Sequence, residues 1–235
     1  FSSNFVGADL ANLMLQFDFG DGKKWQGTTR AMSAVFRASK VYDPRLDSSP
    51  GADPTNSSYI AYRRNPALTT ANFLMSPVGG AFPADEIDWD DVVTAADICD
   101  ELVADKDGGT QPRYTCNGVI YCVPEQFEDN VKKLVDSMLG FITYRDGKWR
   151  MRAGAWTSVP AGNAIVRSDW LSIEQVVLVA GRESRYNEVK SFYIRKDLLW
   201  QRGECVPRVN LTYRTADGNE RNALEVEQPL CIDES

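Results

Sequence analysis

The chain has 235 residues and a mass of 26.2 kDa, enough for one or two domains with a sizeable core. Apolar residues make up 43% and charged residues 25%, a globular composition that excludes disordered and low-complexity classes. The net charge of −7 argues against a binder whose affinity depends on phosphate contacts, so we expect no specific nucleic-acid partner.

The sequence contains no histidine, which excludes Ser-His-Asp and Cys-His nucleophilic sites and every zinc site with histidine ligands. Its five cysteines form no Cys-x-x-Cys spacing, which favours small buried thiols over a metal site. We expect Cys99, Cys116 and Cys122 to be reduced, and Cys205–Cys231 is the one pairing left open. The sequence therefore predicts no catalytic residue, no cofactor and no metal site.

Residues 1–64 are expected to form a β-rich segment with a long exposed arm. Loosely alternating apolar residues between Leu13 and Phe36 suggest strands. From Tyr42 to Asn65, Asp-Pro and Ser-Ser-Pro-Gly sequences predict a long loop. A loop of this length within a compact domain is typical of a functional segment or an interaction arm.

Two helices are predicted to follow this arm. Asn65 can cap the first, Pro66 suits its first turn, and Pro77 ends it. Asp88 can cap the second, whose apolar residues keep helical spacing as far as Val103.

A third helix and three hairpins complete the expected elements. The third helix should open at Pro124 and end with Gly140 as its C′ residue. Strand-like runs cover residues 175–180 and 189–194. Hairpin turns are predicted from three dipeptides that accept positive φ: Asn117-Gly118, Asp146-Gly147 and Asp217-Gly218.

These elements predict an α+β fold in which mixed strands and hairpins flank a central group of about three helices. Residues 65–160 would form a helix-hairpin-helix-hairpin unit, with a weak boundary near residues 155–165. Residues 161–235 would form a second β-rich segment with an incomplete C-terminus. Because the chain starts at Phe1, we expect it to be a piece of a longer protein, although processing would look the same.

An acidic stretch from Asp85 to Asp107 raises the question of a calcium site or a catalytic carboxylate pair. An EF-hand loop beginning at Asp105 would need a bidentate glutamate where the chain has Cys116. The stretch is therefore interpreted mainly as a solvated helix face. Carboxylate pairs for glycoside cleavage could also be drawn from it or from Glu183 and Glu188, but chance alone supplies such pairs.

The first candidate interface lies in the predicted arm. Tyr59 and Tyr62 stand beside Arg63 and Arg64, and tyrosine and arginine dominate interface hot spots. The alternative is a loop that these two tyrosines hold against its own domain.

The second candidate interface is one face of the hairpin at Asp146-Gly147. Alternation puts four basic residues on that face: Arg145, Lys148, Arg150 and Arg152. Because like charges repel, we expect an acidic surface nearby, either the helix from Asp88 or an adjoining subunit. The alternative is a basic face left in water, where salt screens its charges.

Several motifs in order carry a resemblance to a known family. They are Val41-Tyr42-Asp43-Pro44-Arg45, Asn65-Pro66-Ala67-Leu68, Ala96-Asp97-Ile98-Cys99-Asp100-Glu101, the run from Gly108 to Gly118, Gly147-Lys148-Trp149, and Arg185-Tyr186-Asn187-Glu188-Val189. Together they resemble the tail-tip attachment (host-specificity) protein J family of lambda-like siphophages, from about residue 5 to residue 195. None of these motifs is catalytic.

The resemblance implies a structural hub of the phage tail tip, made in the host cytoplasm and incorporated into the virion. Three copies of such a protein close the tail tube and contact other tail-tip and tail-tube proteins. A far C-terminal region, not matched here, contacts the host outer-membrane receptor. The alternative is a carbohydrate-active or sugar-binding phage tail module, which would show a deep pocket with converging carboxylates.

Overall fold

The computed structural model describes residues 37, 39–48, 53–105, 108–123, 125–156, 167, 181 and 185–232. The chain divides into two compact units, Phe1–Lys40 and Val41–Ser235, and nearly all described residues belong to the second. The strands expected between Leu13 and Phe36 and the run at residues 175–180 lie outside the described residues. So does most of the expected boundary near residues 155–165.

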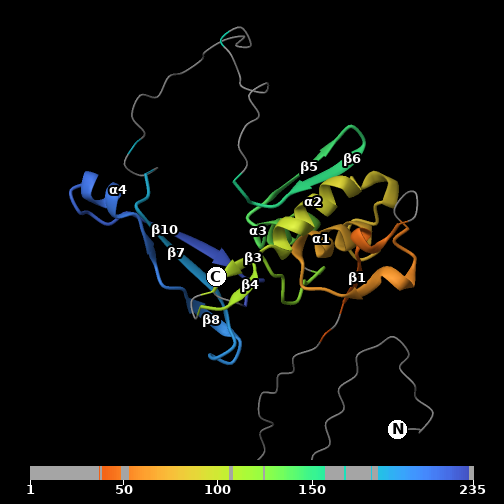
Figure 1. Cartoon of the computed structure of the whole chain (residues 1–235), viewed down its shortest axis with the longest axis horizontal. Helices are drawn as coiled ribbons and strands as arrows, with labels where there is room; N and C mark the ends of the chain where they lie inside the picture. Colours follow the sequence, from red (N-terminus) through yellow and green to blue (C-terminus); the bar gives the residue numbers. More distant parts are fainter. Residues whose placement is uncertain are drawn as a thin grey trace, which may run out of the picture. The chain divides into compact units, whose positions relative to one another are not determined.

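The predicted α+β class is confirmed. In the described residues, three substantial helices lie close together, with small antiparallel hairpins and one four-stranded mixed sheet (Figure 1). The helices are α1 (Pro66–Met75), α2 (Trp89–Asp100) and α3 (Phe127–Asp136). Helix α1 packs on both α2 and α3, and α2 packs on strand β6 (Lys148–Arg152).

Helix α1 forms where its capping residue predicted it. The Asn65 side-chain oxygen accepts hydrogen bonds from the backbone N–H groups of Ala67 and Leu68 at 3.1 and 3.3 Å. Pro66 occupies the first turn, where its missing N–H costs nothing. The helix ends at Met75, two residues before Pro77.

Helix α2 begins as predicted but ends earlier. The Asp88 carboxylate accepts the Asp91 N–H at 3.3 Å, and the helix stops at Asp100. The apolar residues expected to continue the stripe instead form strand β3 (Leu102–Ala104), which pairs with β4 (Thr110–Pro112). A run of only two or three apolar residues fits both the pattern of a helix and that of a strand. Periodicity therefore could not show whether these residues continue α2 or form a strand.

Helix α3 ends in a Schellman arrangement that differs from the prediction. The N–H of Gly140 donates to the Val135 carbonyl and the N–H of Leu139 donates to the Asp136 carbonyl. Leu139, with φ +49°, therefore takes the left-handed position expected for Gly140. Gly140 is needed for a different reason, because a Cβ there would collide with the backbone oxygen of Arg152.

The hydrophobic core lies between these helices and the hairpin beside them. Its fully buried members come from α1, α2, α3, the turn after α3, and β6: Leu68, Leu74, Val92, Leu134, Met138 and Met151. Phe73, Phe82, Phe127 and Trp149 form a chain of ring contacts at its edge, with centroid separations of 5.0–6.5 Å. These helices therefore share one apolar core.

The predicted long arm is more structured than a loop. Strand β1 (Lys40–Tyr42) pairs with β2 (Ile60–Tyr62), and two short 3₁₀ turns, η1 (Pro44–Leu46) and η2 (Ser57–Tyr59), lie between them. The Asp43 N–H donates to the Tyr59 carbonyl at 3.0 Å. The expectation of an exposed arm is therefore wrong for its base, because Tyr42 and Asp43 are buried.

The hairpin at Asp146-Gly147 has the predicted turn and faces. Strands β5 (Phe141–Arg145) and β6 pair with Ile142 opposite Met151 and Tyr144 opposite Trp149. Asp146 and Gly147 both have positive φ, at 55° and 75°, as a type I′ turn requires. The hairpin therefore faces the core with its apolar side.

The hairpin predicted at Asn117-Gly118 does not form. The N–H of Cys116 donates to the Arg64 carbonyl and the N–H of Asn117 donates to the Leu230 carbonyl, each at 2.7 Å. These backbone groups are thus bonded to distant segments rather than to each other. The Asn-Gly dipeptide is a local signal, whereas the hydrogen-bond partners of Cys116 and Asn117 lie 52 and 113 positions away in the sequence.

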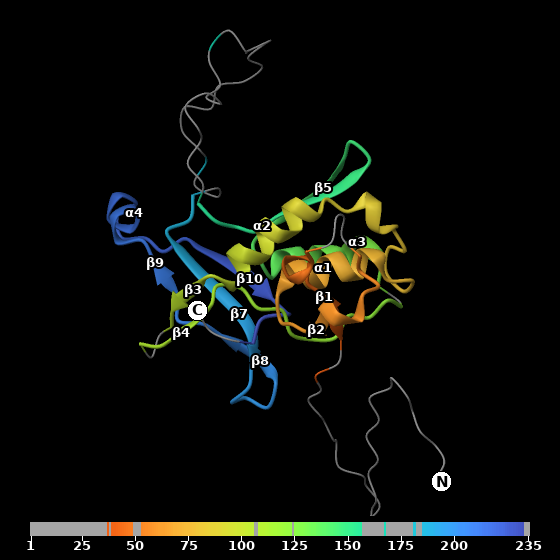
Figure 2. The same ribbon diagram turned by 45° about the vertical axis from the view of Figure 1, so that its right-hand side comes forward.

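The C-terminal sheet contains strands β7 (Glu188–Arg195), β8 (Gln201–Glu204), β9 (Arg208–Val209) and β10 (Ala223–Gln228) (Figure 2). Strand β10 runs parallel to β7, whereas β8 and β9 run antiparallel to it. The register shifts by one residue between β8 and β9, which marks a bulge around Pro207, a residue that cannot donate to the ladder.

The third predicted hairpin, at Asp217-Gly218, is also wrong. Helix α4 (Leu211–Ala216) precedes this turn, and the Asn210 side chain caps the helix by accepting the Tyr213 N–H at 3.1 Å. The turn therefore ends a helix, and the chain crosses over to β10 parallel to β7. The same glycine chemistry serves both kinds of turn, so the dipeptide alone could not distinguish them.

Candidate functional site

The motif residues around Arg45 form a charged brace between the arm and α2. The Arg45 guanidinium donates to both carboxylate oxygens of buried Asp43 at 2.9 Å each. It also reaches Asp97 at 3.1 Å and Asp100 at 2.8 Å. Asp97 and Asp100 stand one turn apart on α2, so one planar group can contact both. Arg63 adds a second cation 3.4 Å from Asp43.

The brace sets the ionisation of Asp43. Burial alone would raise the pKa of this carboxyl group. Hydrogen bonds from Arg45, together with the charges of Arg45 and Arg63, outweigh burial and hold the pKa of Asp43 below its ordinary value of 3.8. Asp43 is therefore a structural anion at neutral pH.

The second motif joins α1 to α2 through one buried amide. While its side-chain oxygen caps α1, the Asn65 amide nitrogen donates to the Ala96 carbonyl at 2.9 Å. Asparagine alone combines an acceptor and a two-proton donor in this shape, so neither aspartate nor serine could replace it here.

Arg64 and the run ending at Gly118 form a third internal connection. The Arg64 side chain donates to Asn117 Oδ1 at 2.9 Å and to the Thr115 hydroxyl at 3.4 Å. Tyr114, in the same run, donates its hydroxyl proton to the Gly154 carbonyl at 2.5 Å. Segments that are far apart in the sequence therefore meet in one framework.

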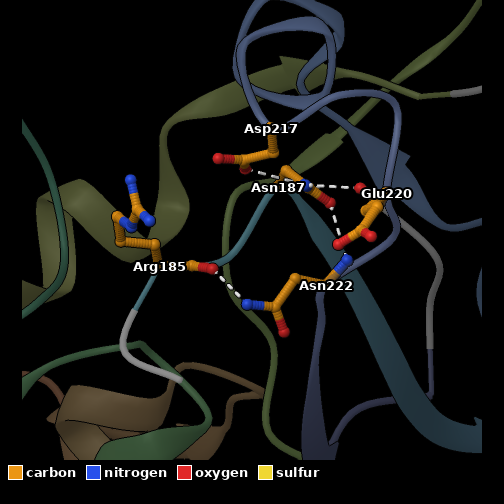
Figure 3. A pocket seen from close by; sticks show the side chains of 5 residues that line it. All are labelled: Arg185, Asn187, Asp217, Glu220 and Asn222. Carbon is orange, nitrogen blue, oxygen red and sulfur yellow. Dashed lines mark hydrogen bonds between the residues drawn. The ribbon is translucent and has the colours of Figure 1, made fainter. Parts of the chain in front are cut away.

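Asn187 organises the C-terminal sheet in the same manner (Figure 3). Its amide nitrogen donates to Asp217 Oδ2 at 3.0 Å and to the Glu220 carbonyl at 2.9 Å. Its side-chain oxygen accepts the Asn222 N–H at 2.9 Å. Asn187 is buried, and its side chain closes the turn between α4 and β10. The hollow among these residues and Arg185 measures about 10 Å³, room for about one water molecule.

Glu188, a member of one carboxylate pair weighed from the sequence, is engaged by Arg221. Arg221 Nε donates to Glu188 Oε2 at 2.6 Å, and Arg221 Nη2 donates to the other oxygen. The hydrogen bonds from Arg221 hold the pKa of Glu188 below its ordinary 4.5. A general acid for glycoside cleavage needs the opposite shift. Its suggested partner, Glu183, lies outside the described residues.

The residues of the first candidate interface lie at the rim of the brace. Tyr59 is half-buried and Tyr62 is 38% exposed, at the end of β2. The Arg63 side chain forms an ion pair with Asp43, and the Arg64 side chain donates a hydrogen bond to Asn117. The structure thus gives both arginines internal partners, and an interface role for the four residues stays a prediction.

The second candidate interface is a partly neutralised basic face. Arg150 lies 3.3 Å from Asp88 at the start of α2, which agrees with the expectation that the helix from Asp88 lies near the basic face. Arg145 lies 3.1 Å from Asp146 in its own turn. For Lys148 and Arg152, both exposed, the structure shows no ion pair with a described residue. The basic face therefore retains positive charge at the protein surface.

The sequence analysis missed exposed apolar side chains on this hairpin and in the segments just before and after it. Phe141 is 57% exposed and shares the outer face of the hairpin with Arg152, its cross-strand neighbour. Leu139 is also exposed, and Trp156 is 96% exposed. The period-2 pattern that assigned the basic residues could have placed Phe141, whereas nothing local marks Leu139 or Trp156.

No metal or membrane-spanning feature emerges from the part of the chain that the structure describes. Its acidic and cysteine side chains include no group of three or more that could hold a metal ion. None of its helices is long and apolar enough to cross a membrane. Asp105, considered above as a calcium ligand, accepts the Gly109 N–H at 2.7 Å in the β3–β4 turn.

No protein-family model matches the chain, and no curated protein matches it.

Proposed function

We propose that this chain is a structural subunit of a phage tail tip, a central hub that helps to close the tail tube. The observation that carries the proposal is the convergence of the motifs on which the resemblance rests. Arg45 joins the first motif to Asp97 and Asp100 of the third, and Asn65 of the second bonds to Ala96. These motif residues hold the fold together, and a protein with the same hub fold would need the same contacts.

The surface supports an assembly role. Aromatic residues and arginines dominate the energetics of protein interfaces, and large exposed apolar side chains mark contact sites when they gather. Phe141 is exposed on the basic hairpin face, where Arg152 is its cross-strand neighbour. Trp156, four residues after the end of β6, is 96% exposed. We propose that this side contacts other copies in a homotrimer or neighbouring tail-tip and tail-tube proteins within the virion.

We propose no enzymatic activity. Glu188 is held ionised by Arg221, and the hollow around its neighbour Asn187, which Glu188 does not line, is too small for a sugar residue. A screen on polysaccharide, peptidoglycan and ester substrates should therefore show no turnover. Turnover that a single carboxylate substitution abolishes would instead support the carbohydrate-active alternative.

The experiment is a mass measurement of the intact protein by light scattering after gel filtration. The expected species is a trimer. In the variant Arg145→Glu/Arg152→Glu, the trimer should weaken, with the largest effect at low salt, because charge contacts are screened within about 8–10 Å at physiological ionic strength. Lys132→Glu on the exposed side of α3 is the matched control. A monomer at every salt concentration and protein concentration would contradict the trimeric hub.

A further inference from the structure

Two segments separated by more than a hundred residues meet at the edge of the core. The Asn117 N–H donates to the Leu230 carbonyl at 2.7 Å. Leu230 is only 4% exposed and joins the core of the helical region. A Cβ on Gly118 would lie 2.7 Å from Leu230 Cδ2, so the glycine leaves room for this side chain. The contact is therefore packed as well as hydrogen-bonded.

Cys116 and Cys231 flank this contact. Cys116 precedes the donor residue and Cys231 follows the acceptor residue, so their Cα atoms stand on either side of one backbone hydrogen bond. Both cysteines lie outside the strands, and the 2.7 Å hydrogen bond between their neighbours Asn117 and Leu230 brings the two residues into the same part of the fold.

The two sulfur atoms also approach the same neighbour. Cys231 Sγ lies 3.8 Å from the Thr115 carbonyl oxygen, in the residue just before Cys116, and 3.9 Å from the Ser137 carbonyl oxygen. The Ser137 side chain also lies close enough to the Cys116 thiol to lower its pKa, although burial outweighs this effect. Both thiols therefore converge on Ser137, at the C-terminal end of α3.

We propose that Cys116 and Cys231 are an oxidisable pair that closes to a disulfide in the presence of a disulfide oxidant such as oxidised glutathione. All five cysteines are thiols in the structure, so this is the reduced state. The pairing replaces the Cys205–Cys231 bridge left open by the sequence, and it limits the expectation that Cys116 stays reduced to reducing conditions. It does not depend on the proposed tail-tip function.

The reaction balances as two exchange steps. The Cys231 thiolate attacks oxidised glutathione, forms a mixed disulfide and releases one glutathione thiolate. The Cys116 thiolate then attacks Cys231 Sγ and expels the second glutathione. The protein loses two protons and two electrons, and one oxidised glutathione becomes two reduced molecules.

The raised pKa of Cys116 favours this order of steps. Burial raises the pKa of the Cys116 thiol to about 11, so little of it is thiolate at neutral pH. Cys116 therefore acts as the second, resolving thiol. We expect the rate of ring closure to rise about tenfold per pH unit between pH 7 and pH 10, because the thiolate fraction rises in that proportion.

Closing this pair would tie the C-terminal sheet covalently to the helical region. A disulfide that encloses so long a loop restricts the unfolded chain strongly. We therefore expect the midpoint of thermal unfolding to rise by about 5–15 °C on oxidation and to return on reduction.

The test is a disulfide map of the full chain after incubation with oxidised glutathione at pH 8, alkylation and non-reducing digestion. Cleavage after Tyr121 is required, because trypsin leaves Cys116 and Cys122 on one peptide. We expect one cross-linked pair joining Cys116 to Cys231, with Cys99, Cys122 and Cys205 still alkylated. A Cys205–Cys231 or Cys99–Cys116 link in the folded chain, or glutathione retained on Cys231 without ring closure, would overturn the proposal.

Variants provide the control. Cys231→Ser should abolish both the cross-link and the rise in the unfolding midpoint, whereas Cys205→Ser should leave both intact. If Cys116→Ser fails to fold, comparison of Cys231→Ser with Cys205→Ser still shows whether the cross-link requires Cys231. A cross-link that persists in Cys231→Ser, or an oxidised wild type whose midpoint does not rise, contradicts the inference.

Discussion

Residues 41–156 and residues 185–232 are held together by different means. The first region buries a continuous apolar core, to which the second contributes Leu230 among the residues that the structure describes. In the C-terminal sheet, most side chains of β7 and β10 are at least partly exposed. Buried or paired polar groups support it instead: Asn187, Glu188 with Arg221, and Arg202 with Glu227.

This contrast indicates which region can stand alone. Apolar burial contributes about 25 cal/mol per Å², and the helical region has it in abundance. Hydrogen bonds exchanged with water contribute only about 1 kcal/mol each, so the sheet depends on its few clamps and on its docking through Leu230. A sheet with this little core is suited to gaining stability from a partner.

The largest expected effect comes from emptying the helical core. Leu134→Ala should lower the free energy of unfolding by about 3–5 kcal/mol, because a fully buried leucine is lost and a cavity remains. The matched change in the sheet, Leu224→Ala, should cost about 0.5 kcal/mol, since this side chain is 36% exposed. Urea unfolding followed by tryptophan fluorescence measures both. Equal losses would remove the contrast between the regions.

The next effect comes from the brace. Asp43→Asn should destabilise the helical region by about 2 kcal/mol, because charge-assisted hydrogen bonds to Arg45 are lost in a buried setting. Asp90→Asn, at an exposed position of α2, is the control and should cost a few tenths of a kcal/mol. Urea unfolding at pH 7 compares the two.

The pH dependence of the same pair has a definite sign. Because the folded pKa of Asp43 lies below 3.8, its contribution is fully present above that value and is lost as the pH falls through the folded pKa. The stability gap between wild type and Asp43→Asn should therefore shrink below about pH 4. A gap that stays constant down to pH 2 would show that Asp43 is not a braced anion.

A smaller and local effect is expected at Asn187. Asn187→Ala removes three hydrogen bonds that close the turn between α4 and β10, at a cost of about 1–2 kcal/mol to the sheet. Amide hydrogen exchange should quicken in residues 210–228 and remain unchanged in α1 and α2. Quickened exchange throughout both regions would mean that they unfold as one unit.

The smallest effect concerns the basic hairpin. Arg150→Glu should cost about 0.5–1 kcal/mol because it sets two like charges together at Asp88. Arg152→Glu should be near neutral in the isolated chain. The difference, measured by urea unfolding, should fade as salt is raised from 20 mM to about 1 M. A larger loss for Arg152 would place the acidic partner elsewhere.

Local chemistry made part of this fold predictable. Asn65 and Asp88 cap their helices, and Asp146-Gly147 forms its hairpin, since each signal acts within four residues. The same logic failed at Asn117-Gly118 and Asp217-Gly218. There, distant backbone groups or a helix end used the positions that a hairpin would have needed.

The connections between motifs could not be predicted from the sequence. Arg45 meets Asp97 across 52 positions, and neither hydrophobic periodicity nor charge pattern specifies which acid an arginine will reach. Leu139 adopts the left-handed conformation, although the next residue, Gly140, would adopt it more easily. Gly140 is needed at its own position because its backbone packs closely against the backbone oxygen of Arg152. Which acid Arg45 contacts and which residue becomes left-handed both depend on packing in the folded protein, and a single sequence does not show that packing.

The proposal that this chain is a tail-tip subunit implies that a phage or prophage encodes it. Its most direct test is imaging of particles produced by the source of this chain, combined with quantitative mass spectrometry of the purified particles. The account predicts three copies per particle, with density at the distal end of the tail into which the α1–α3 core fits. Particles that are complete and infectious but lack this chain, or that carry it away from the tail tip, would contradict it.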